Sequence, residues 1–219
     1  MYIGCMETRP AKAIPVYMAI TALIGWFALG LQLYLIIKTN VDAGKTVLYG
    51  IINFFSFFTI LSNILVALSF TLSLLWPSSL SGRFFSRTTV RSAICLYILV
   101  VGIVYSLVLR QIWDPQGWQL VADRLLHDAI PLIYVVFWLL FVTKGVLQWK
   151  NTIPWLIFPL IYLVYSLLRG AVTGWYAYPF INVAELGFSK VLLNIMIMLA
   201  AFLGVGLFLT MVNRSMKKA

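Results

Sequence analysis

The chain has 219 residues, of which 63% are hydrophobic and only 10% charged, and its mean hydropathy is +0.99. These values exclude a water-soluble domain and indicate an integral membrane protein. The net charge of +10 does not indicate a nucleic-acid partner, because the cations lie between apolar stretches, where they set membrane topology and contact lipid headgroups.

Six apolar stretches follow one another with short connections. Since a membrane-spanning helix needs about 20 mostly apolar residues, six such helices use the whole chain. In chain order we place them at residues 14–37, 48–76, 90–109, 125–143, 153–168 and 191–210. Residues 1–15 lack the features of a cleavable signal peptide, so the first stretch is expected to remain as a helix. The prediction is an all-α integral membrane protein, with residues 1–219 forming a single bundle of six transmembrane helices.

Lys and Arg residues are distributed unequally between the two sides. The side that holds both termini carries ten, whereas the other side carries six together with five of the six acidic residues. The positive-inside rule therefore predicts that the N- and C-termini are cytoplasmic. A bacterial inner membrane is favoured over an organelle membrane, and the oligomeric state is left open.

With this orientation, polar residues gather in the outer half of the membrane. This pattern predicts a polar chamber that opens to one face. The residues are Asn53, Ser56, Thr59, Asn63, Arg110, His127, Asp128, Arg169 and Asn194.

In the stretch 48–76, Ser56, Thr59 and Asn63 follow the spacing i, i+3, i+7. On one continuous helix this spacing places them on a single face. An alternative is structural: Ser and Thr often bond back to a carbonyl one turn earlier, and Asn often joins membrane helices.

His127 is the only histidine and therefore the only side chain whose unperturbed pKa lies near neutrality. Asp123 precedes it by four residues, so on a helix the carboxylate can orient the imidazole ring. An interfacial histidine and a plain helix-start carboxylate are the alternatives. Asp128 is expected to pair with Arg124, which lies four residues before it. A single histidine without a second His or Cys nearby argues against a metal site.

Residues 169–180 combine glycines with four aromatic residues, which suits either a lid or an ordinary aromatic belt. Arg110 and Arg169 are expected at helix ends on the same face. They are candidates for binding a carboxylate or phosphate group, with snorkelling to lipid phosphate as the alternative.

Three short features together resemble a known family. They are the run 57–63 (FFTILSN), the single His127 at the start of a proline-containing helix, and the run 178–180 (YPF). The chain resembles the androgen-induced six-helix membrane hydrolases, which cleave fatty-acid esters of hydroxy fatty acids with an intramembrane threonine and a histidine. It also resembles a bacterial six-span family of unassigned function. The resemblance implies that Thr59 is the nucleophile and His127 the base.

Threonine is a weak nucleophile that needs an adjacent base, so the expected chemistry is acyl transfer from a lipid ester to Thr59, with water completing the hydrolysis. Asn63, Asn194 or Arg110 are candidates for stabilising the oxyanion. Asn53, Ser56, Asp123 and Arg169 complete the candidates for substrate binding. The expected partners are membrane lipids and a lipid-like substrate. No cofactor is expected, since neither a phosphate-binding glycine loop nor metal-ligand spacing occurs.

Two other classes of function fit the same residues. A binding or transport protein would use the polar side chains to coordinate a lipid or small solute. A scaffold would use them only to hold helices together. The sequence also leaves open transfer of the acyl group to an acceptor other than water.

Overall fold

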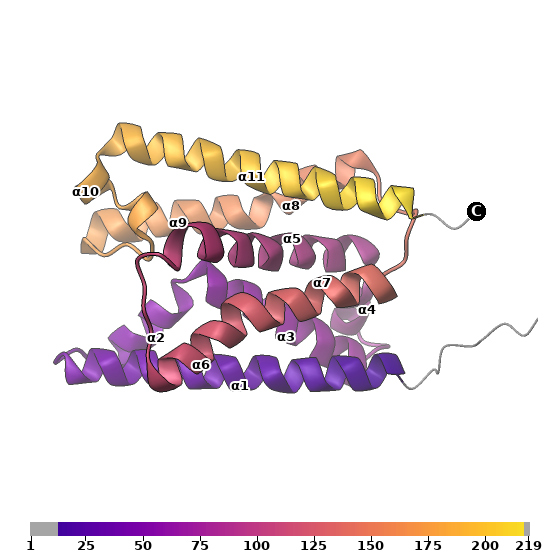
Figure 1. Ribbon diagram of the computed structural model, residues 1–219, viewed down its shortest axis with the longest axis horizontal. Coiled ribbons are helices and arrows are strands. Elements are labelled where there is room, and N and C mark those ends of the chain that lie inside the picture. Colours follow the sequence, from indigo (N-terminus) through magenta and orange to yellow (C-terminus); the bar gives the residue numbers. More distant parts are fainter. Residues whose placement is uncertain (1–12, 217–219) are drawn as a thin grey trace, which may run out of the picture.

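The computed structural model describes residues 13–216, which form helices joined by short turns and contain no strand (Figure 1). Six helical segments are long and apolar enough to cross a membrane: Ala13–Asp42, Phe58–Leu75, Thr88–Leu109, Gly117–Phe141, Trp149–Thr173 and Phe188–Ser215. The predicted all-α architecture, with six helices that are long and apolar enough to cross a membrane, is confirmed for the described residues. This pattern is that of an integral, multi-pass membrane protein.

Several of the spanning segments are built from more than one element, because turns of π- or 3-10-helix interrupt the regular α-helix. The elements are α1 (Ala13–Asp42), α2 (Val47–Phe55), α3 (Phe58–Leu75), α4 (Leu80–Ser86), α5 (Thr88–Val104), η1 (Tyr105–Leu109), α6 (Gly117–Arg124), η2 (Leu125–Ala129), α7 (Ile130–Phe141), η3 (Trp149–Asn151), α8 (Thr152–Trp155), α9 (Ile157–Thr173), η4 (Pro179–Ile181), α10 (Val183–Leu186) and α11 (Phe188–Ser215).

Helix α5 lies at the centre of the bundle, where it packs against α3, α7 and α11. Figure 1 shows α9 and α11 on one side of α5, and α1, α3 and the α6–α7 segment on the other. Fully buried Leu96 and Ile98 of α5 and Tyr134 and Trp138 of α7 belong to the core between these layers. This arrangement leaves the outward faces of the outer helices apolar, as a lipid environment requires.

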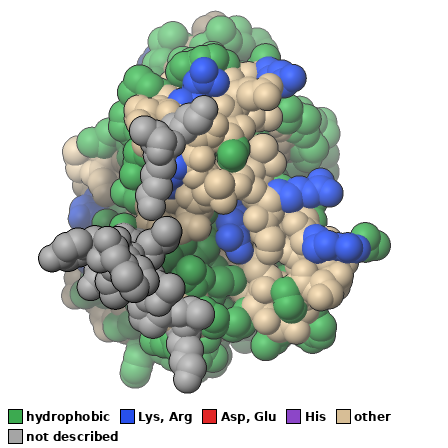
Figure 2. Space-filling view, turned by 90° about the vertical axis from the view of Figure 1, so that its right-hand side faces the viewer, with side chains coloured by type: hydrophobic (Ala, Val, Ile, Leu, Met, Phe, Trp, Pro, Cys, Tyr) green, Lys and Arg blue, Asp and Glu red, His purple; other side chains and the backbone are tan. Residues whose placement is uncertain are grey.

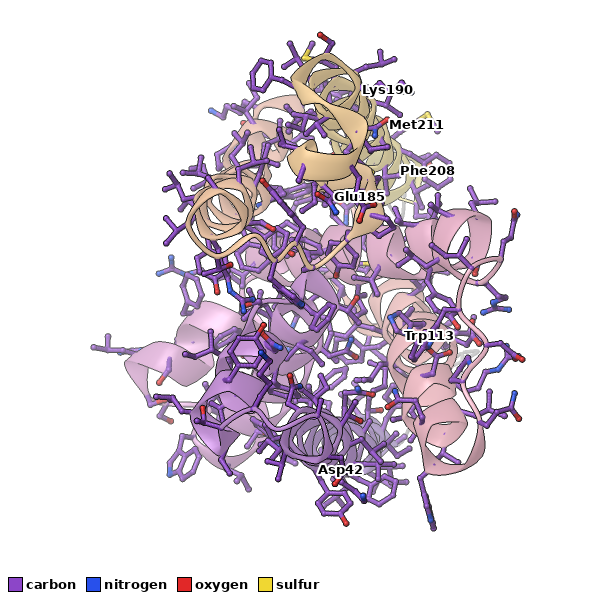
Figure 3. All side chains as sticks on the ribbon, turned by 90° about the vertical axis from the view of Figure 1, so that its left-hand side faces the viewer. Asp42, Trp113, Glu185, Lys190, Phe208 and Met211 are labelled. Atoms are coloured by element: carbon purple, nitrogen blue, oxygen red, sulfur yellow. The ribbon has the colours of Figure 1, made fainter. Side chains whose placement is uncertain are left out.

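The two ends of the bundle differ in composition. Helix α1 begins and α11 ends at one end, which we call the basic end (residues 76–92, 138–155 and 210–216); it carries the Lys and Arg side chains seen in Figure 2. The opposite end, the polar end (residues 38–59, 105–128 and 169–190), faces the viewer in Figure 3, where Asp42, Trp113, Glu185 and Lys190 are labelled. The acidic residues of the described part, Asp42, Asp114, Asp123, Asp128 and Glu185, all belong to the polar end.

The stretch 48–76 is not the single helix that we predicted. Helix α2 ends at Phe55, Phe57 has an extended backbone (φ −93°, ψ 128°), and α3 begins at Phe58. The Ser56 hydroxyl lies 2.6 Å from Ile52 O and 2.6 Å from the Tyr165 hydroxyl, while the Ser56 carbonyl accepts a hydrogen bond from Tyr162 (2.9 Å). Because groups on α9 satisfy this turn, the helix can break inside the bundle. Ser56 therefore does not share a helix face with Thr59 and Asn63.

The other helices differ from the prediction only in where they begin and end. The helix predicted at 125–143 begins at Gly117, and the one predicted at 191–210 extends from Phe188 to Ser215. Both extensions consist of polar or mixed sequence, which a criterion based on hydropathy does not include.

Candidate functional site

Thr59 lies where α3 begins, at its second residue. A helix start leaves backbone N–H groups without acceptors in the helix, and here no side chain of the N-cap residue Phe57 binds them. The Thr59 N–H instead donates to the Tyr178 hydroxyl (3.2 Å), which also lies 3.3 Å from Thr59 Oγ1. The break that we did not predict thus places a buried threonine at the positive end of a helix.

His127 lies in the π-helical turn η2, four residues before Pro131. Pro131 has no N–H to return to the His127 carbonyl, which favours the wider turn. Helix α5 packs closely against this turn, since a Cβ at Gly102 would lie 3.3 Å from His127 O. A side chain at position 102 would therefore require the backbone of this turn to shift slightly.

The imidazole ring of His127 is held on two sides. Its Nδ1 lies 3.0 Å from Asp123 O and 3.2 Å from Asp123 Oδ1, and its ring stacks on Tyr105 with centroids 4.0 Å apart. Tyr105 in turn donates a hydrogen bond from its hydroxyl to Asp123 Oδ2. The predicted proximity of Asp123 and His127 is confirmed. With Nδ1 directed at Asp123, the ring's other nitrogen, Nε2, remains for chemistry.

Thr59 and His127 line the same cavity, which has a volume of about 480 Å³. Its wall combines apolar residues with polar ones from α1, α2, α3, η1, α6 and η2 and from the segment between α9 and η4. The polar residues are Gln32, Thr39, Asn40, Asn53, Thr59, Tyr105, Gln119, Asp123, His127 and Tyr178. The site therefore brings a hydroxyl, an imidazole and a carboxylate to one hollow at the polar end, as the sequence predicted for the first two.

A second, smaller cavity of about 80 Å³ meets the first at Thr59, Tyr105, Leu109 and Tyr178. The rest of its lining comes from α3, α5, α9, α11 and the segment before α10 and is almost entirely apolar, including Phe58, Val100, Tyr162, Met198 and Phe202. Thr59 therefore lies between a mixed polar hollow and an apolar one.

The glycine- and aromatic-rich segment between α9 and α11 forms part of the cavity wall. Trp175, Ala177, Tyr178 and Pro179 line the larger cavity. The segment turns at Gly174 (φ 69°) and lies tightly on α9, because a Cβ at Gly170 would approach the Tyr176 ring to 2.0 Å. Burial raises the pKa of Tyr178, so its hydroxyl stays protonated and available as a donor.

Three of the other candidate residues serve the packing of the bundle rather than the cavity wall. Asn63 donates to Thr59 O (2.8 Å) and Leu126 O (3.2 Å), and so joins α3 to η2. Asn194 donates to Phe180 O (2.8 Å) and fixes the turn η4 to α11. Ser56 belongs to the break between α2 and α3. None of the three is among the residues that line the two cavities.

The two candidate arginines, Arg110 and Arg169, differ in the groups that they bind. Arg110 pairs with Asp128, which also binds Arg124 at 3.0 Å, so the predicted Arg124–Asp128 pair is confirmed. Arg169 donates to Asn53 Oδ1 and lies over the Trp175 ring, with 4.0 Å between its Cζ and the ring centroid. Arg110 is thus neutralised by a protein carboxylate, and Arg169 contacts two residues of the cavity wall.

Tyr105 and Tyr178 were missed as site residues by the sequence reasoning, although Tyr178 belongs to the YPF run. Tyrosine is common at membrane interfaces, so neither position carries a distinguishing signal in sequence. Among residues 13–216, no group of three or more His, Cys, Asp or Glu side chains could hold a metal ion.

Comparisons of the chain with protein-family models, curated proteins and solved structures found no match. The fold and the site therefore define only a class of protein: a six-helix membrane protein whose cavity is lined by a threonine, a histidine and an aspartate.

Proposed function

We propose that this chain is an intramembrane hydrolase of lipid esters of the fatty-acid ester type, with Thr59 as nucleophile and His127 as general base. The observation that carries the proposal is that both side chains line one cavity although they belong to different helices. The stacking and hydrogen bonding around His127 add to it, since a base must be held in one tautomer and one orientation.

In the proposed reaction, Thr59 Oγ1 attacks the ester carbonyl while His127 Nε2 accepts its proton. Asp123 holds the Nδ1 proton and stabilises the imidazolium that forms. The imidazolium then gives its proton to the leaving alcohol oxygen, which leaves an acyl–Thr59 ester. Water attacks this ester while His127 accepts a proton of that water. The imidazolium then returns the proton to Thr59 Oγ1 as the bond to the acyl carbon breaks, which releases the fatty acid and restores Thr59 and neutral His127.

The oxyanion that forms on the carbonyl oxygen needs donors close to Thr59. Backbone N–H groups in the first turn of α3 and the Tyr178 hydroxyl lie there, and they replace Asn63, Asn194 and Arg110 as our candidates. Donors fixed before the reaction stabilise developing charge without reorganisation.

The apolar parts of the two cavity walls support a lipid-like substrate. The cavity of about 80 Å³ has room for only a short part of an acyl chain, so we place the ester and most of its chain in the larger cavity of about 480 Å³, whose wall includes Phe57, Ile60 and Leu126. We further propose that both termini are cytoplasmic, because the basic end follows the positive-inside rule, so that the cavity lies in the outer half of a membrane.

Labelling with a lipid-like fluorophosphonate probe tests this function, since such a probe reacts only with an activated hydroxyl. We expect detergent-purified wild-type protein to be labelled, and Thr59→Ala and His127→Ala to remain unlabelled while folded. Thr39→Ala is the matched control, because Thr39 lines the same cavity on another helix. Equal labelling of Thr59→Ala and wild type would reject Thr59 as the nucleophile. No labelling of folded wild type would reject the hydrolase and favour binding or transport of a lipid.

A further inference from the structure

Arg169 lies at the polar end, and one nitrogen of its guanidinium forms no hydrogen bond among the described residues. Its Nη2 donates to Asn53 Oδ1, whereas its Nη1 is buried and has no hydrogen-bond partner among residues 13–216. A buried donor without a partner is costly, and a guanidinium cannot lose its charge to avoid that cost.

Arg169 also differs from the other arginines of this end in its charge balance. Arg110 and Arg124 share Asp128, but no carboxylate of the described part lies within ion-pair distance of Arg169. A partly buried cation that lacks a protein anion is a place where an external anion is stabilised.

The position of Arg169 is fixed by groups that belong to the larger cavity. Asn53 Nδ2 donates to Asn40 Oδ1 (3.2 Å), and Asn40 Nδ2 donates to Ile36 O (2.8 Å), so this chain of amides orients the Asn53 oxygen toward Arg169. Asn40, Asn53 and the stacked Trp175 all line the larger cavity. Arg169 itself is not among the residues that line this cavity, so its guanidinium lies directly behind Asn53 and Trp175 in the wall and is held there before any ligand binds.

We propose that Arg169, with Asn53 and Trp175, forms an anion-binding subsite of the larger cavity for the carboxylate or phosphate group of an amphiphile. The guanidinium fork matches the oxygens of both groups. The ligand is an amphiphile, because Phe57, Ile60 and Leu126 give the same cavity an apolar wall. This subsite does not require Thr59 or His127 to be catalytic. Its test is therefore independent of the test of the proposed hydrolysis.

Binding of oleate and of oleyl alcohol, which share a chain and differ in charge, tests the subsite. The full-length protein is captured in phosphatidylcholine nanodiscs, and saturable binding of each radiolabelled ligand is measured against empty nanodiscs. We expect wild type to bind oleate at least about tenfold more tightly than oleyl alcohol, as charge-assisted hydrogen bonds provide. Arg169→Gln should lose this preference.

Lys190→Gln is the matched control and should keep the preference. It removes an exposed positive charge of the polar end which, unlike Arg169, has no hydrogen bond to a residue of the cavity wall. Adding phosphatidate to the nanodiscs separates the two sources of anion: displacement of oleate assigns the subsite to a membrane-lipid phosphate, and no displacement assigns it to a fatty carboxylate. Equal binding of oleate and oleyl alcohol by wild type would overturn the proposal without any variant. An unchanged preference in folded Arg169→Gln would overturn it as well.

Discussion

The two ends of the bundle both contain buried polar side chains, but they use them differently. At the basic end these side chains satisfy one another across helices: Trp138 Nε1 donates to Ser92 Oγ (2.8 Å), and the Thr152 and Thr210 hydroxyls lie 3.1 Å apart. At the polar end, Thr59, Asp123 and His127 surround a cavity instead. Buried polar groups that satisfy one another hold helices together, whereas polar groups arranged around a cavity remain available to a ligand, which is why we place the candidate site at the polar end.

The largest effect on activity is predicted for substitutions of Thr59 and His127, at the polar end. In an assay with a fluorogenic fatty-acid ester, either alanine substitution should lower kcat by about 10²–10⁴-fold, because proton transfer and attack are both lost. The double variant should be no slower than the slower single variant, since the two residues act as a unit. Additive losses would indicate that they act separately.

Asp123→Asn should reduce kcat by about 10²-fold, since it leaves the imidazole in place but removes the acceptor that fixes its tautomer. The neighbouring Asp128→Asn is the control. Asp128 binds Arg110 and Arg124, so its loss should change kcat by no more than about fivefold. Similar losses for the two variants would mean that Asp123 has no special role toward His127.

Tyr178→Phe should lower kcat by about two- to tenfold, because it removes one hydroxyl contact with Thr59 and leaves the aromatic packing in place. Tyr176→Phe, in the same segment, serves as the control and should have wild-type kcat. An effect on KM alone would show that Tyr178 contributes to uniform binding of the substrate rather than to the transition state.

The smallest effect on activity is predicted for Asn213→Ala at the basic end. Asn213 accepts from the N–H groups of Val146 and Leu147 (3.2 and 3.1 Å) and donates to Thr143 O (2.8 Å). Its removal leaves buried groups without partners, so the free energy of unfolding in detergent should fall by about 1–3 kcal/mol. Exposed Ser215→Ala should change stability by less than about 0.5 kcal/mol. Loss of ester hydrolysis in folded Asn213→Ala would contradict the separation of the two ends.

The sequence predicts the spanning helices well because hydropathy over about 20 residues reports directly on the lipid environment. It does not predict the break at Ser56 and Phe57, because that turn is stabilised by Tyr162 and Tyr165, which are distant in sequence. Asn213 was likewise overlooked, since it lies beyond the predicted helix 191–210.

In the candidate site, too, contacts between residues that are near in sequence are predictable, whereas contacts between residues distant in sequence are not. The relation of Asp123 to His127 follows from an i, i+4 spacing and is predictable. The places of Tyr105 and Tyr178 depend on packing between helices, as do the structural roles of Asn63 and Asn194. Sequence spacing alone therefore predicts the contact between Asp123 and His127 but not the residues that pack around them.

The most direct test of the central claim is to identify the residue that carries the fluorophosphonate adduct. Wild-type protein is labelled in detergent, digested and sequenced by mass spectrometry. We predict a single adduct on the Thr59 hydroxyl, which disappears when His127 is replaced by alanine. An adduct on any other residue, or none on folded protein, would contradict the assignment of Thr59 as the nucleophile.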